Sequence, residues 1–96
     1  MHPKQYSCKD PLYAAWIKSQ RCMICGSYAQ SHGHHCFHAR KNDYLMIPLC
    51  AEHHTIGPKS YHRMGVKSFC DHHKINLDWE IINHLSRYIS EKMNGN

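Results

Sequence analysis

Apolar residues first recur at helical spacing after a polar stretch near the start of the chain. Asp10 followed by Pro11 is typical of a helix start, with an N-cap residue and a proline at the first helical position. The pattern predicts a short helix over residues 10–20. Leu12 and Trp16 share one face of it, so we expect that face to cover a small core with Trp16 as its anchor.

The clearest helical pattern lies further along the chain and predicts a helix over residues 78–93. Asp78 is placed to be its N-cap, and Leu77 is placed for a hydrophobic staple. Because an apolar stripe runs along one side of this helix, we expect the helix to complete the core. The stripe consists of Trp79, Ile82, Leu85 and Ile89, and Ile81 and Tyr88 widen it.

Between these helices, two runs with β character, residues 29–38 and 44–49, are joined by a polar turn. They predict an antiparallel β-hairpin. Alternation places His34 and His35 on opposite faces of the first strand. Both can serve one site only if the strand ends or bulges beside them, and Gly33 makes such a break possible.

The segment after the hairpin predicts two short helical elements. Residues 50–56 form a helix or a tight turn, on which His53 and His54 point to different sides because adjacent helical residues are about 100° apart. Ser60 is placed to cap a second helix over residues 60–71. Its packing residues are expected to be Tyr61, Met64 and Phe69.

The chain has 96 residues, which predicts one domain with a core too small to be comfortably stable on packing alone. A bound metal would add stability. The start of the chain lacks the apolar run of a secretory signal, and no stretch is long enough to span a membrane. We therefore expect a cytoplasmic, reducing setting, in which a Cys-x-x-Cys pair binds metal or does redox chemistry.

Twelve Lys and Arg against seven Asp and Glu give a formal charge of +5 and a pI near 9.0. This excess favours a polyanionic partner such as nucleic acid, although small soluble domains also carry a few surplus charges. Eleven histidines are more informative, because neutral imidazole is both the commonest metal ligand and the commonest general base near neutral pH.

Two pairs of metal-ligating residues share the same two-residue gap. Cys22 and Cys25 have the form of a zinc knuckle, and Cys50 with His53 makes a second pair. Together they form a Cys₃His set of the kind that closes a tetrahedral zinc site. Cys36 is an alternative to one of these ligands. A thioredoxin-like redox pair has the same spacing but needs a larger α/β fold.

A further series of histidines with one aspartate occupies the same region. Its order is a double histidine, a hairpin turn with Asp, Pro-Leu-Cys-x-x-His-His and Ser-x-His-x-x-Gly, which resembles the HNH, or His-Me finger, endonucleases. The resemblance covers residues 22–73 and is strongest to small phage HNH proteins related to the recombination-enhancement nucleases. The residues that carry it are His34, His35, Asp43, Pro48, Leu49, Cys50, His53, His54, Ser60, His62 and Gly65.

The resemblance implies an α+β fold with a small ββα-metal core, stapled by zinc and flanked by helices. His35 is then the general base that activates water, and Asp43 orients it or closes the hairpin turn. His34 and His54 are then ligands of one catalytic divalent metal. His62 is the candidate for the remaining ligand, because no ligand follows His54 by one helical turn.

The implied function is hydrolysis of DNA phosphodiester bonds, with Mg²⁺, Mn²⁺, Zn²⁺ or Ni²⁺ as catalytic metal beside a structural Zn²⁺. The resemblance also implies a recombinase filament or another phage protein as a further partner. It implies the host cytoplasm as the location of the protein, and a monomer or a homodimer as its oligomeric state. Basic residues near the site in sequence are candidates for gripping phosphates. They are Arg40, Lys41, Lys59, Arg63 and Lys67.

The remaining histidines and cysteines are assigned no chemistry. We expect surface or capping positions for His32, His38, His72, His73 and His84, a core position for Cys70 and no role for Cys8.

The predicted organisation is a single domain over residues 1–96. It comprises a flexible arm (1–9), a helix (10–20), the zinc knuckle with the HNH-like core (22–73) and a C-terminal helix (78–93). Two other functions stay open. One is a zinc-stabilised DNA- or protein-binding module without catalysis, and the other is a redox protein that uses Cys22 and Cys25.

Overall fold

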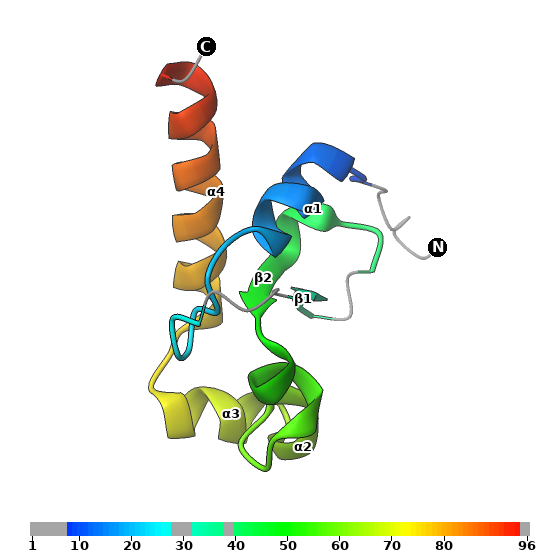
Figure 1. The fold of residues 1–96 in the computed structure, drawn as a ribbon, viewed down its shortest axis with the longest axis vertical. Coiled ribbons are helices and arrows are strands. Elements are labelled where there is room, and N and C mark those ends of the chain that lie inside the picture. Colours follow the sequence, from blue (N-terminus) through cyan, green and yellow to red (C-terminus); the bar gives the residue numbers. More distant parts are fainter. Residues whose placement is uncertain (1–7, 28–31, 38–39, 95–96) are drawn as a thin grey trace, which may run out of the picture.

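The computed structural model describes residues 8–27, 32–37 and 40–94. It has the α+β character that the sequence predicted, with helices around a two-stranded antiparallel sheet (Figure 1). In chain order the elements are α1 (Pro11–Lys18), β1 (His32–His35), the 3₁₀ turn η1 (Asp43–Leu45), β2 (Met46–Leu49), the π-helical turn η2 (Glu52–Ile56), α2 (Tyr61–Met64), α3 (Val66–His73) and α4 (Leu77–Asn94). None of the described helices is both long and apolar enough to cross a membrane.

The hairpin is confirmed, but both strands are shorter than predicted. β1 pairs with β2 in a register that sets His34 opposite Ile47 and His35 opposite Met46. The second strand begins only at Met46, because Asn42 caps the 3₁₀ turn before it by accepting the Tyr44 N–H at 3.0 Å. Of the first predicted run, residues 29–31 and 38 lie outside the described part of the chain.

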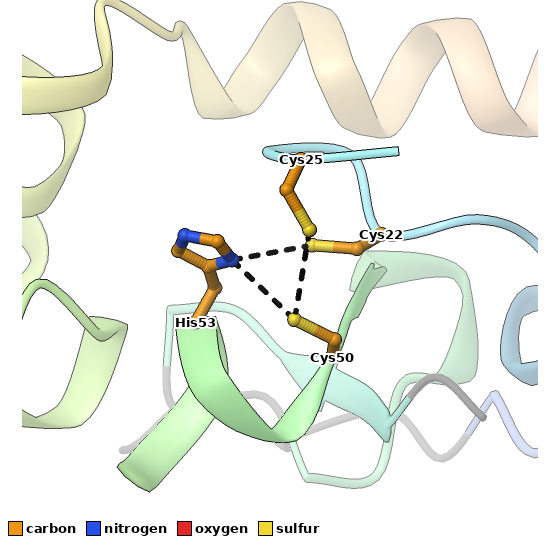
Figure 2. Close-up of side chains that lie close together, drawn as sticks. All are labelled: Cys22, Cys25, Cys50 and His53. Carbon is orange, nitrogen blue, oxygen red and sulfur yellow. Dashed lines mark hydrogen bonds between the residues drawn. The ribbon is translucent and has the colours of Figure 1, made fainter. Parts of the chain in front are cut away.

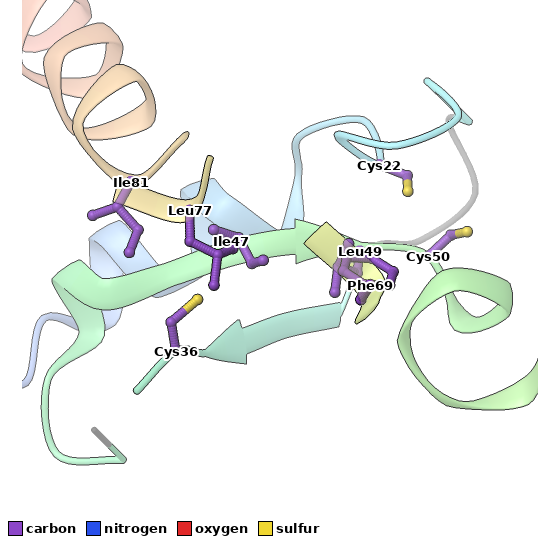
Figure 3. Packing of buried hydrophobic residues seen from close by; sticks show 8 residues of the cluster. All are labelled: Cys22, Cys36, Ile47, Leu49, Cys50, Phe69, Leu77 and Ile81. Carbon is purple, nitrogen blue, oxygen red and sulfur yellow. The ribbon is translucent and has the colours of Figure 1, made fainter. Parts of the chain in front are cut away.

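β2 is the central element of the main core. All four residues of β2 are buried, whereas the residues of β1 are exposed or partly exposed. Side chains of β1 therefore stay accessible to solvent and to ligands. Figure 3 shows Ile47 and Leu49 of β2 among side chains from α3, α4 and the cysteine-bearing loops. The cluster contains Cys22, Cys36, Ile47, Leu49, Cys50, Phe69, Leu77 and Ile81.

The N-terminal helix forms where predicted, with Asp10 as its cap, but it buries a different face. Tyr13 and Ile17 are fully buried against Met46, whereas Leu12 is 69% exposed. Trp16 is only half-buried and lies beside Tyr13, with ring centroids 5.8 Å apart. Tyr13 takes the buried position because the aromatic rings of Tyr44 and Tyr88 surround it.

The C-terminal helix also corrects the sequence prediction. It begins at Leu77 and is capped by Asn76, whose side chain accepts the Trp79 N–H at 3.0 Å, so Asp78 is not the N-cap. The buried side chains of the helix are Leu77, Ile81 and His84. The predicted stripe is wrong in part: Trp79, Ile82 and Ile89 are exposed, whereas Ile81 is buried and Leu85 and Tyr88 pack against a core.

The predicted helix over residues 60–71 is broken into α2 and α3 at Gly65. Gly65 has φ 83° and ψ 156°, a conformation open essentially to glycine alone. Ser60 caps α2 as expected, and Tyr61, Met64 and Phe69 pack on the main core as expected. The corner places Gly65 and Val66 near Gly33, His34 and His35 of β1.

Candidate metal centres and the histidine cleft

Three cysteines and one histidine from two distant segments meet at one point. The Nδ1 of His53 lies 3.4 Å from the Sγ of Cys50 and 3.8 Å from the Sγ of Cys22, and the Sγ atoms of Cys25 and Cys50 are 3.8 Å apart (Figure 2). Zn–S bonds of about 2.3 Å in a tetrahedron place two sulfurs about 3.8 Å apart. The spacing thus fits one tetrahedral ion at this cysteine cluster (Cys22, Cys25, Cys50 and His53).

Local backbone bonds hold the knuckle against the sheet. The Gly26 N–H donates to the Cys22 carbonyl at 2.8 Å, and Gly26 takes a positive φ of 72° that closes the turn. The Met23 N–H donates to the Pro48 carbonyl at 3.1 Å, which ties the knuckle to β2 at a position two residues before Cys50. The two ligand pairs therefore meet because the knuckle is hydrogen-bonded to the end of β2.

The electrostatics of this cluster suit a thiolate. Burial raises the pKa of Cys22, but backbone N–H donors, the largest at Cys50, outweigh it and leave that pKa below its usual value. Burial raises the pKa of Cys50 to about 11, with the neighbouring Cys22 adding to the effect. One thiolate is favoured without a metal, and a divalent cation would deprotonate the others.

A second cluster consists of histidines only. The Nε2 of His54 lies 3.2 Å from the Nδ1 of His34 and 3.2 Å from the Nε2 of His62. Zn–N bonds of about 2.05 Å in a tetrahedron place two nitrogens about 3.3 Å apart, so one ion can reach all three imidazoles. This histidine cluster (His34, His54 and His62) joins β1, η2 and α2.

Two of these imidazoles are held neutral. Burial, followed by the neighbouring imidazoles, lowers the pKa of His34 and of His54 to about 4. A neutral imidazole keeps the lone pair that a metal ion needs. The two histidines are therefore ready to bind a cation at neutral pH without first losing a proton.

His32 is a member of this neighbourhood that the sequence prediction missed. Its Nδ1 lies 2.9 Å from the Nδ1 of His54, on the opposite side of the His54 ring from the cluster. One of these two nitrogens carries the hydrogen that joins them. Only the pairing of β1 with β2 and the turn of η2 bring these residues together, so no local sequence signal could have found this contact.

His35 lies beside the cluster with a different partner. Its Nε2 is 3.0 Å from the Oδ1 of Asp43, and the Oδ2 of Asp43 accepts the backbone N–H of Asp10 at 2.8 Å. Burial raises the pKa of Asp43, but hydrogen bonds from His35 and Asp10 more than offset it, so the net pKa is lowered. Asp43 is thus a buried, charged acceptor. The strand β1 ends at His35, which meets the condition under which His34 and His35 can serve the same site.

Both His35 and the histidine cluster open into one cleft with a volume of about 710 Å³. Tyr61 lines it and packs on His34, with ring centroids 4.0 Å apart. The sequence prediction gave Tyr61 only a packing role and gave Phe37 none. The lining residues are Gly33, His34, His35, Phe37, Arg40, His54, Tyr61, His62, Gly65 and Val66.

Of the five predicted phosphate-binding residues, Arg40 alone lines this cleft. Lys67 instead pairs with Asp71 at 3.3 Å, and Arg63 donates to the Thr55 carbonyl at 3.4 Å. Within the described residues, the carbonyl of Lys41 accepts the Cys8 N–H and the carbonyl of Lys59 accepts from His73.

Other predicted positions are corrected. Cys36 is fully buried in the main core and belongs to neither cluster, while Cys70 packs against that core as expected. His84 is buried instead of at the surface, because it lies on the core face of α4 and its Nδ1–H donates to the Glu80 carbonyl at 2.7 Å. His38 lies outside the described residues.

Comparisons with known proteins give one result. The family model described as protein of unknown function (DUF968) matches residues 1–77, most of the chain. No curated protein and no solved structure matches it.

Proposed function

The chain belongs to the DUF968 family, and we propose that it is a metal-dependent endonuclease of the HNH type that hydrolyses DNA phosphodiester bonds. The observation that carries the proposal is the pairing of His35 with buried Asp43 in the same cleft as three converging imidazoles. A general base beside a metal site is the arrangement that hydrolysis of an anionic ester requires.

The Asp43 contact determines which nitrogen of His35 is the base. Because the carboxylate accepts the Nε2–H, the lone pair resides on Nδ1, which can take a proton from water. Asp43 also stabilises the imidazolium that forms. In this role Asp43 is a positioning residue, and the Asp10 backbone N–H holds it in place.

The histidine cluster fits a single divalent cation at the catalytic site. When bound, such a cation neutralises charge on the phosphate and stabilises the departing 3′ oxygen. His34, His54 and His62 hold it in this proposal, and three protein ligands leave a coordination position for the substrate. The cysteine cluster holds a structural Zn²⁺. Together β1, β2 and η2 serve as the two strands and the helix of a ββα-metal unit.

The decisive experiment is a nicking assay combined with metal analysis. Purified protein supplied with Mg²⁺, Mn²⁺, Zn²⁺ or Ni²⁺ is expected to nick plasmid DNA. His35→Ala is expected to lower the nicking rate at least ~100-fold, the size of a general-base effect, while the zinc content stays the same. His72→Ala removes an exposed histidine outside both clusters and is the matched control.

A second candidate function is a zinc-stabilised binding module without catalysis. The cysteine cluster is complete without any residue of the cleft, and the formal charge of +5 favours a nucleic acid partner. DNA binding by a protein that nicks DNA with none of the four metals would favour this function. Nicking that His35→Ala leaves unchanged would refute the assignment of the base.

A further inference from the structure

The cleft carries exposed apolar side chains that the hydrolytic chemistry does not use. Phe37 and Val66 both line it, and they remain 53% and 46% exposed. A phosphate is recognised through charge and hydrogen bonds, so it does not account for them. They suit a flat, apolar part of the ligand next to the phosphate.

The chain reaches both positions through unusual backbone conformations. Phe37 has a φ of 58°, which is uncommon for a bulky aromatic residue, while its neighbour Cys36 is fully buried in the core shown in Figure 3. Gly65 ends α2 with a φ of 83° and lets α3 start at Val66. Phe37 is thus kept at the cleft in a backbone conformation that costs more than an extended or helical one, and Val66 reaches the cleft through a corner that needs glycine.

We propose that Phe37 and Val66 bind one unpaired nucleobase of the substrate, next to the phosphate held at the histidine cluster. Aromatic side chains bind bases by stacking, and every base offers a π-face. Bases inside a duplex have both faces covered by their neighbours, so only a single-stranded or extruded nucleotide can use this surface. The choice of a nucleic acid as ligand rests on the proposed function.

Size and charge support this ligand. The cleft volume of about 710 Å³ falls in the range of roughly 300–1,000 Å³ found for small-ligand pockets, so the cleft has room for one nucleotide. Arg40 lines the same cleft and offers a cation for an adjoining phosphate. Tyr61 is occupied by its contact with His34, which leaves Phe37 as the aromatic ring free to stack among the described lining residues.

The test compares binding to a labelled single-stranded oligothymidylate with binding to an abasic oligomer of equal length, by fluorescence anisotropy. No divalent metal is added, so nothing is cleaved and the structural zinc stays in place. The wild type is expected to prefer the oligomer with bases by roughly 5- to 150-fold in Kd. Phe37→Ala is expected to lose this preference with no change in Kd for the abasic oligomer, and Phe37→Trp to keep it.

The control is Leu12→Ala, which removes an exposed apolar side chain outside the cleft and is expected to leave both Kd values unchanged. A wild type without base preference, or a Phe37→Ala variant that weakens binding to both oligomers equally, overturns the inference. The nicking assay separates the two proposals. Nicking without a preference for bases would refute only the proposed base-binding surface. A preference for bases without nicking would refute only the proposed endonuclease activity.

Discussion

His53 and His54 are neighbours in the chain and belong to different clusters. The Nδ1 of His53 joins the sulfurs, while the Nε2 of His54 joins the other imidazoles. Their position on the π-helical turn η2 explains the split, since adjacent side chains on a helical turn point in different directions. Single residues here are therefore not interchangeable even when they are of the same type.

His32 is predicted to position His54 for the metal. If the Nε2 of His54 binds the cation, its Nδ1 carries the hydrogen and donates it to the Nδ1 of His32. His32→Phe keeps a ring but removes the acceptor, and we expect about 10- to 100-fold weaker binding of the catalytic metal, measured by calorimetric titration.

The control for this experiment is His72→Phe, which changes an exposed histidine outside both clusters. Zinc bound at the cysteine cluster should be the same in all three proteins. An unchanged metal Kd in His32→Phe would show that His32 does not position His54.

Tyr13 offers a test of the second core cluster. Its side chain is fully buried, and its hydroxyl is the one buried side-chain polar atom without a hydrogen-bond partner among the described residues. Leaving a polar group unpaired in a core costs about 1–3 kcal/mol. Tyr13→Phe is therefore expected to match or exceed the wild type in thermal stability at pH 7.

The same variant predicts a pH dependence. Burial raises the pKa of Tyr13 from its usual 10.0 to about 12. A raised pKa means that the folded state favours the protonated phenol, so this contribution is complete below pH 10 and is lost as the pH rises toward about 12. The wild type should lose stability relative to Tyr13→Phe over that range in thermal denaturation. A constant difference between the two proteins across it would contradict this account.

At the scale of elements, the Gly65 corner sets the direction of α3 and the place of Val66 in the cleft. A Cβ at Gly65 would meet no atom within 4 Å, so a substitution there costs backbone strain alone. We expect Gly65→Ala to lower the unfolding free energy by about 1–3 kcal/mol in urea titration. A cost near zero would mean that α2 and α3 join differently.

Gly33 shows the opposite situation. A Cβ there would overlap the terminal methyl of Met46, which packs over β1. A side chain at Gly33 would therefore have to displace the end of the Met46 side chain, whereas at Gly65 it would strain the backbone. The sequence analysis marked Gly33 as a possible break in the first strand, but it ran the predicted helix over residues 60–71 through Gly65.

Local spacing predicted more of the molecule than helix faces did. The pairs Cys22–Cys25 and Cys50–His53 could be assigned because a metal fixes the distance between ligands, and two-residue gaps meet that distance locally. The buried faces of α1 and α4 could not be assigned, because each helix carries apolar residues on more than one side. Which side of α1 is buried depends on the rings of Tyr44 and Tyr88, which come from η1 and α4 and contact Tyr13.

At the scale of the whole molecule, the cysteine cluster connects the knuckle, the end of β2 and η2 (Figure 2). Structural zinc sites in small domains contribute about 10–16 kcal/mol of apparent binding free energy. Removing zinc with a chelator is therefore expected to abolish cooperative unfolding, followed by circular dichroism. Thermal unfolding that is identical with and without zinc would contradict a structural role for the ion.

Cys25→Ser tests the ligand role without disturbing the core, because Cys25 is exposed while Cys22 and Cys50 are buried. We expect zinc content to fall from one ion per chain and the melting temperature to drop. Cys8→Ser changes a cysteine outside both clusters and should alter neither quantity.

The shared turn η2 has a consequence for how this chain can vary. Since His53 and His54 belong to different clusters on one turn, inserting or deleting a single residue before them would put one histidine in the other's position and turn the other away from both clusters. Every histidine would still be present, yet one of the two clusters would lose its histidine from η2. Functional variants of this chain must therefore keep the number of residues before His53 and His54 in this turn. A comparison of residue composition alone would not detect an insertion or a deletion there.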